Sequence, residues 1–116
     1  MRYTFPRMAW LYLLIAGLLE IVWATALKFS DGFSRLLPTV TALVTAWASF
    51  WFLSLAIRKI PIGTAYAVWV GIGAVGVAIV GMVWFRESRD FWRLFFIGLI
   101  VAGVVGLKMV SRDEGL

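Results

Sequence analysis

One acidic residue lies inside an apolar segment, and it is the residue of this sequence with the clearest chemical potential. Glu20 interrupts Met8–Leu27, which otherwise holds no charged residue, whereas the other acidic residues fall between or after the apolar segments. If Met8 begins a membrane helix, Glu20 lies about 12 residues in, or ~18 Å deep, near the middle of a bilayer. A charge there costs about 2.5–3.5 kcal/mol on insertion scales, so such a carboxylate marks an ion or proton path by default.

A carboxylate at that depth can exchange ligands. Loss of hydration disfavours its charged form, so Glu20 is expected to hold either a proton or an organic cation. That competition is the minimal requirement of an antiporter. The alternative is a structural role, in which a protonated Glu20 donates a hydrogen bond to a neighbouring helix.

Helical spacing places further candidates beside this carboxylate. Gly17 and Trp23 share the stripe of Glu20, because residues three or four apart lie on one helix face. Gly17 permits the close approach of a backbone or a ligand, and Trp23 offers an indole N–H to the carboxylate and a ring face to a cation. Lipid packing is the alternative reading of Trp23.

Two later apolar segments contribute polar and aromatic side chains. Ser49 lies at mid-depth of Leu36–Ile57, where it serves either helix packing or a hydrogen bond to Glu20. Tyr66 and Trp69 are three apart in Ile60–Phe85, so they share a face suited to cation–π contact.

Glycines mark two other features. Gly71, Gly73 and Gly76 predict a kink in the third segment, a natural hinge for opening a site to alternate sides, although tight packing explains them as well. Gly98, Ala102 and Gly106 recur every four residues in the last segment, a small-xxx-small register that predicts a dimer seam.

The elements that must position these residues are membrane helices. Of the 116 residues, 63% are hydrophobic, well above the roughly 45–50% of soluble domains. A spanning helix needs roughly 20 apolar residues, so the sequence predicts an all-α integral membrane protein with a bundle of four transmembrane helices. The predicted organisation is an N-terminal extension (1–7), a transporter domain (8–110) with spans at about 8–27, 36–57, 60–85 and 94–110, and a C-terminal tail (111–116).

Loop charges bear on orientation. The N-terminus, the second loop and the C-terminal end hold Arg2, Arg7, Arg58, Lys59, Lys108 and Arg112. The first and third loops hold Lys28, Arg35, Arg86, Arg89 and Arg93. Six basic residues against five, of the 11 in the chain, give almost no orienting bias, so two oppositely inserted copies are expected to pair, unless other signals fix one orientation.

Composition also excludes several classes. The sequence has no cysteine and no histidine, which removes disulfides, the usual zinc sites and Cys- or His-based nucleophile pairs. No plausible nucleophile–base pair is present, so an enzyme is not expected, and neither is a cofactor or a metal. The net charge of +5 flanks apolar runs instead of forming a stripe, which indicates contact with membrane lipid and not with nucleic acid.

Three stretches resemble a known family. AGLLEIVWATALKFSDGFSRLLPT, PIGTAYAVWVGIGAVG and GLIVAGVVGLK are similar to the small multidrug resistance family of bacterial proton-coupled exporters, over roughly Met8–Met109. Trp23, Ser49 and the GIGAVG run at Gly71–Gly76 resemble the guanidinium-exporter subtype.

The resemblance implies an antiparallel, dual-topology homodimer in the bacterial inner membrane. In it, the Glu20 of each protomer exchanges protons for guanidinium or a small substituted guanidinium. It also implies a site lined by Gly17, Trp23, Ser49, Tyr66 and Trp69.

One departure from the subtype concerns the substrate. Val70 stands where the subtype usually has Thr, so the substrate range is open. Export of quaternary ammonium or aromatic cations is one alternative, and a role as one subunit of a heterodimeric exporter is another.

Overall fold

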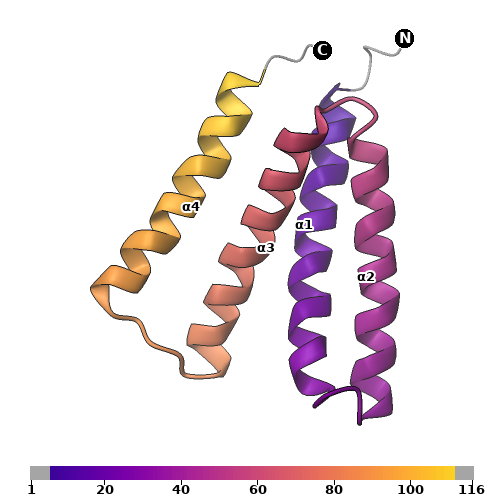
Figure 1. Ribbon diagram of the computed structural model, residues 1–116, viewed down its shortest axis with the longest axis vertical. Helices are drawn as coiled ribbons and strands as arrows, with labels where there is room; N and C mark the ends of the chain where they lie inside the picture. The colour runs from indigo at the N-terminus through magenta and orange to yellow at the C-terminus, as the bar shows by residue number, and fades with distance from the viewer. Residues whose placement is uncertain (1–5, 112–116) are drawn as a thin grey trace.

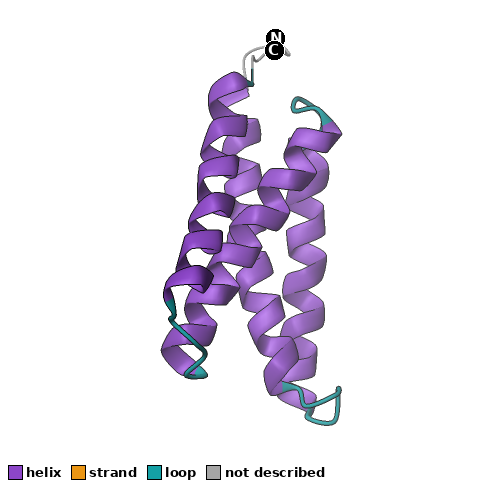
Figure 2. Ribbon diagram, turned by 60° about the vertical axis from the view of Figure 1, so that its left-hand side comes forward, coloured by secondary structure: helices purple, strands orange, loops and turns teal. Residues whose placement is uncertain are grey.

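The computed structural model describes residues 6–111 and consists of four helices (Figure 1). They are α1 (Pro6–Phe29), α2 (Leu36–Ala56), α3 (Ile62–Trp84) and α4 (Phe91–Val110). No strand occurs in this part of the chain (Figure 2). Residues 1–5 of the predicted extension and 112–116 of the predicted tail lie outside the described residues.

Each helix is long and apolar enough to cross a membrane. The candidate spans are Met8–Phe29, Leu36–Ala56, Ile62–Trp84 and Phe91–Val110, of 20 to 23 residues. Even the shortest therefore measures about 30 Å, the thickness of a hydrocarbon core. The predicted all-α fold of four transmembrane helices is confirmed.

The helices form a thin layer in which α1 is central. The described fold measures 45 × 36 × 17 Å. Helix α1 packs most extensively on α2 and next on α3, while α4 packs on α3 on the side away from α2 (Figure 1). The beginning of α1 and the end of α4 lie at one end of the layer, because short connections make successive helices antiparallel.

The first connection is a tight turn tied by a serine. Asp31, Gly32 and Phe33 all have positive φ angles, of 50°, 71° and 66°. Such angles are uncommon outside glycine and are typical of a tight turn. Ser30 is fully buried, and its hydroxyl donates to the Leu27 carbonyl (2.6 Å) and accepts from the Phe33 N–H (3.1 Å). These bonds close the end of α1 and return the chain into α2.

Small residues bring α1, α2 and α3 together. The core joins Leu13 and Ala16 of α1 to Ala56 of α2 and to Ala65 and Trp69 of α3. In lipid, helices associate through close packing of such residues, because apolar surface is already solvated by acyl chains. Helix α4 buries no residue, so most of its surface is left for lipid or for another chain.

The three glycines of the predicted kink lie opposite side chains of other helices. A Cβ on Gly71 would collide with Val104, one on Gly73 with the Glu20 carboxylate, and one on Gly76 with Ile21. Helix α3 is assigned without interruption from Ile62 to Trp84. The glycines therefore provide close packing, and the kink stays a prediction.

Candidate functional site

The carboxylate of Glu20 lies against the backbone of α3 at Gly73. A Cβ added at Gly73 would overlap the carboxylate, with the Glu20 Cγ only 2.8 Å away. The Glu20 side chain is half-buried, and its buried Oε1 accepts no hydrogen bond within the described chain. A buried oxygen without a donor is costly, which makes it a place where a proton or a donor-bearing ligand is stabilised.

Trp23 supplies a second unpaired atom one helical turn further along α1. Its indole Nε1 is buried and, within residues 6–111, donates to no acceptor. Its ring packs on Phe50, with the ring centroids 6.4 Å apart. A free donor and a free acceptor thus stand three residues apart on one helix face.

Ser49 connects the three packed helices at the level of Glu20. Its fully buried hydroxyl donates to the Ala16 carbonyl (2.7 Å) and accepts from the Trp69 Nε1–H (3.0 Å). Ala16 precedes Glu20 by four residues, so its carbonyl also receives the Glu20 backbone N–H in the helix ladder. Ser49 was expected either to pack or to bond Glu20; in the structure its single proton is given to α1 backbone. The bond fixes the turn that carries Glu20.

Aromatic rings form a continuous wall beside this turn. Tyr66 and Trp69 have ring centroids 5.4 Å apart, Trp69 and Phe50 are also 5.4 Å apart, and Phe50 leads on to Trp23. Aromatic faces at this spacing attract cations. Phe50 is absent from the sequence-based candidates, because a half-exposed phenylalanine in an apolar span carries no signal that separates it from a lipid-facing one.

The remaining candidates differ in what surrounds them. Gly17 is buried against Ile72. A Cβ added to Gly17 would lie only 2.6 Å from the Ile72 side chain, so the glycine permits close contact between α1 and α3. Tyr66 is 56% exposed and Val70 is 38% exposed, so this side of the site is open on a single chain. The predicted seam residues Gly98, Ala102 and Gly106 belong to α4, apart from Glu20, and a Cβ on either glycine would meet nothing within 4 Å.

The arrangement suits cation binding more than bond-making chemistry. It combines one carboxylate, an aromatic wall and an unpaired indole donor. Among the described residues, no three His, Cys, Asp or Glu side chains cluster as metal ligands would.

Comparisons with known proteins agree with this chemistry. The family model described as Small Multidrug Resistance protein matches residues 8–100. A protein of Yersinia pseudotuberculosis named Guanidinium exporter is 55% identical over 104 residues, which cover 90% of this chain and all of that protein. Proteins of the same name from Citrobacter freundii and Salmonella typhimurium are 54% identical over 105 residues, again 90% of this chain and all of theirs.

These matches confirm the family expected from the sequence, and the names of the relatives agree with the expected subtype. With a family model over most of its length, relatives matched from end to end and four helices able to span a bilayer, the chain belongs to the small multidrug resistance family of membrane transporters.

Proposed function

We propose that this protein exports guanidinium, or a small substituted guanidinium, across the bacterial inner membrane in exchange for protons. The observation that carries the proposal is the buried Glu20 Oε1 without a donor, held against Gly73 beside the aromatic wall. The names of relatives 53–55% identical to this chain support the choice of substrate.

Competition at one carboxylate would couple the two fluxes. The planar N–H donors of guanidinium match carboxylate oxygens in a two-point hydrogen bond, which an ionised Glu20 can accept and a protonated one cannot. Substrate arriving on one side therefore displaces the proton, and a proton arriving on the other side displaces the substrate. Neither ligand needs a metal or a covalent intermediate.

Two antiparallel copies would complete the site. On one chain Glu20 is half-buried and Tyr66 faces outward, so a second copy is needed to enclose a small cation. The face of Gly98, Ala102 and Gly106 is free for that contact, and six basic residues against five permit both insertions. Each protomer then contributes one carboxylate.

Flux across proteoliposomes tests the proposal. Guanidinium uptake into vesicles should require an outward proton gradient, and Glu20→Gln should abolish the coupled flux. Asp31→Asn, in the first loop, is the matched control for loss of one acid and should retain transport. Coupled flux at the wild-type rate in Glu20→Gln vesicles refutes the role of this carboxylate. Because the chain is reconstituted alone, transport also tests the requirement for a second homologue.

The aromatic wall favours a broader cation range as a second candidate. Val70 adds no hydroxyl next to Trp69, and four rings bind quaternary ammonium or aromatic cations without hydrogen bonds. Guanidinium and tetraphenylphosphonium should be compared in the same vesicles. Selective guanidinium flux supports the first substrate class, and equal or greater tetraphenylphosphonium flux supports the second.

A further inference from the structure

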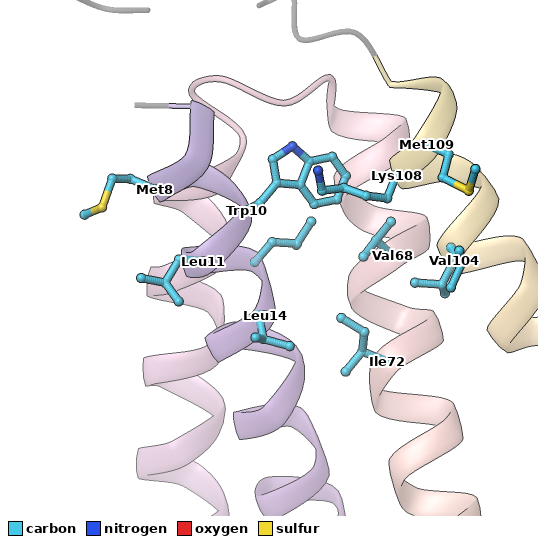
Figure 3. Close-up of a pocket in the computed structure, with 11 residues that line it drawn as sticks. Met8, Trp10, Leu11, Leu14, Val68, Ile72, Val104, Lys108 and Met109 are labelled. Carbon is cyan, nitrogen blue, oxygen red and sulfur yellow. The ribbon is translucent and has the colours of Figure 1, made fainter. Parts of the chain in front are cut away.

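A groove of about 680 Å³ lies apart from the Glu20 site, between α1, α3 and α4. It is lined by Met8, Trp10, Leu11, Leu13, Leu14, Val68, Ile72, Val104, Val105, Lys108 and Met109. Figure 3 shows Lys108 beside Trp10 at one end of it, with Leu14 and Ile72 further along. Every lining side chain except Lys108 is apolar, so the groove offers hydrocarbon along its length and one positive charge at its end.

The charged end lies at the level of lipid headgroups. Lys108 belongs to the last turn of α4 and Trp10 lies near the start of α1, and these helix ends meet at the same end of the layer. The Lys108 ammonium lies 4.8 Å from the centroid of the Trp10 ring. Lysine and tryptophan at helix ends are typical of the membrane interface, where phosphates are found.

We infer that this groove binds an anionic phospholipid, with an acyl chain along Leu14 and Ile72 and the phosphate at Lys108. Polarity along the groove matches that of the lipid, because both carry charge at the interface and hydrocarbon below it. A cationic substrate is disfavoured here, since the lining has no carboxylate and Lys108 would repel it.

A second copy of the chain is the weaker occupant. On α4 the groove is lined by Val104, Val105, Lys108 and Met109, and Val104 packs into Gly71 of α3. At 3.6 residues per turn, the middle of this set lies about a quarter of a turn from the middle of the open face of Gly98, Ala102 and Gly106, with Met109 at the shared edge. A copy seated on that open face would therefore meet the groove at its Met109 edge and leave the side of Val104 and Lys108 open to the bilayer.

Native mass spectrometry of the full-length protein in detergent tests the inference. Phosphatidylglycerol and phosphatidylcholine with identical acyl chains are offered separately, and glycerol 3-phosphate supplies the charged headgroup without chains. We expect about fivefold more adduct with phosphatidylglycerol than with phosphatidylcholine, as one lysine near an anionic headgroup provides, and no adduct with glycerol 3-phosphate.

Two variants and their controls locate the binding. Lys108→Gln should reduce the phosphatidylglycerol preference to about onefold, while Lys28→Gln, which removes a lysine from the last turn of α1, should keep it. Leu14→Trp should fill the groove and remove most adduct, while Leu43→Trp, on the exposed face of α2 outside the groove, should not. Circular dichroism verifies that each variant is folded.

The opposite results overturn the inference. Equal binding of the two lipids, or an unchanged preference in Lys108→Gln, excludes an anionic lipid at this lysine. Wild-type adduct in Leu14→Trp excludes the groove, and loss of the dimer mass in that variant without loss of lipid assigns the groove to the second copy.

Discussion

At the scale of single residues, the site is defined by which buried polar atoms have partners and which do not. The Trp69 Nε1–H donates to the Ser49 hydroxyl, which donates to the backbone of α1, whereas the Glu20 Oε1 and the Trp23 Nε1 stay unpaired in the described chain. In the proposed function, the hydrogen-bonded pair is the rigid support, and the two unpaired atoms are where the ligand binds.

The support is expected to be measurable through Ser49. Ser49→Ala removes the acceptor of the Trp69 Nε1–H and the donor to the Ala16 carbonyl, both at a fully buried position. Leaving such a buried group without its partner costs about 1–3 kcal/mol. The thermal unfolding midpoint in detergent should fall and guanidinium should bind more weakly. Ser54→Ala is the control, because within residues 6–111 the Ser54 hydroxyl bonds to its own helix, at Trp51, and its loss should leave both quantities near wild type. Equal effects of the two variants would contradict the assigned support.

The contact of Glu20 with Gly73 gives a second expectation. A methyl group in Gly73→Ala would displace the Glu20 carboxylate, so transport should fall at least about tenfold, the effect of ~1.4 kcal/mol, while the helices remain folded. Gly63→Ala adds the same methyl group near the start of α3, where nothing lies within 4 Å, and should transport normally. Normal flux from Gly73→Ala vesicles would show that this contact is dispensable.

Sequence reasoning reached the residue types of the site but not their pairing. Glu20, Ser49 and Trp69 could be placed at similar depth by counting along each span. Which acceptor receives the one Ser49 proton depends on helix rotation and tilt, which packing decides and spacing does not. For the same reason Phe50, which links the Trp69 and Trp23 rings, could not be selected in advance.

At the scale of the helices, α4 shows what sets a helix end. The charge-free window places the fourth span at about 94–110, but α4 begins at Phe91, with Arg93 inside its first turn. Asp90 is the N-cap, and its Oδ1 accepts from the Arg93 N–H at 2.9 Å. An aspartate before an apolar run is an expected N-cap, so the sequence itself indicates a helix that begins after Asp90. The charge-free window begins too late because Arg93, inside the first turn, interrupts it.

This cap predicts a pH dependence of stability. The hydrogen bond from the Arg93 backbone, followed by that from the Ser88 hydroxyl, lowers the pKa of Asp90 below its ordinary 3.8. A pKa lowered by folding means stabilisation that is fully present above the ordinary value and lost as pH falls through the folded value. The unfolding midpoint of Asp90→Asn should therefore lie below wild type at pH 6 and approach it in acid below the ordinary pKa.

The measurement is a pair of unfolding curves collected from neutral pH down into strong acid. Asp31→Asn, which removes a loop charge without removing a cap, is the control for net charge. A constant gap between Asp90→Asn and wild type across that range would show that the carboxylate charge is irrelevant to the cap.

At the scale of the whole molecule, the single chain is a layer with one helix largely uncovered. Helix α4 buries no residue, and Gly98 and Gly106 would accept a Cβ without meeting any atom within 4 Å. Four spans followed directly from hydrophobicity and loop length, because lipid leaves few other ways to satisfy the backbone. Hydrophobicity and loop length do not predict which face of the chain pairs with a second chain. The small-residue register of α4 is common and does not by itself select a partner.

A bulky residue on the predicted seam separates these possibilities. Gly98→Leu should shift the detergent-solubilised protein from dimer toward monomer and reduce transport in parallel, because close approach at the seam is lost. Gly103→Leu is the matched control on α4, since Gly103 also has open space around its Cβ but lies about 100° from the midpoint of the seam. Light scattering with size-exclusion chromatography measures the masses. A dimer unaffected by Gly98→Leu but broken by Gly103→Leu would place the interface on another face of α4.

The exchange of a proton for a cation at Glu20 is tested most directly by guanidinium affinity as a function of pH, measured on the purified protein in detergent. The apparent Kd should be constant at alkaline pH and rise by about tenfold per pH unit in acid for each proton displaced, while Glu20→Gln should bind guanidinium weakly at every pH. An affinity that does not change with pH, or a Glu20→Gln protein with the same pH profile as wild type, would contradict the account.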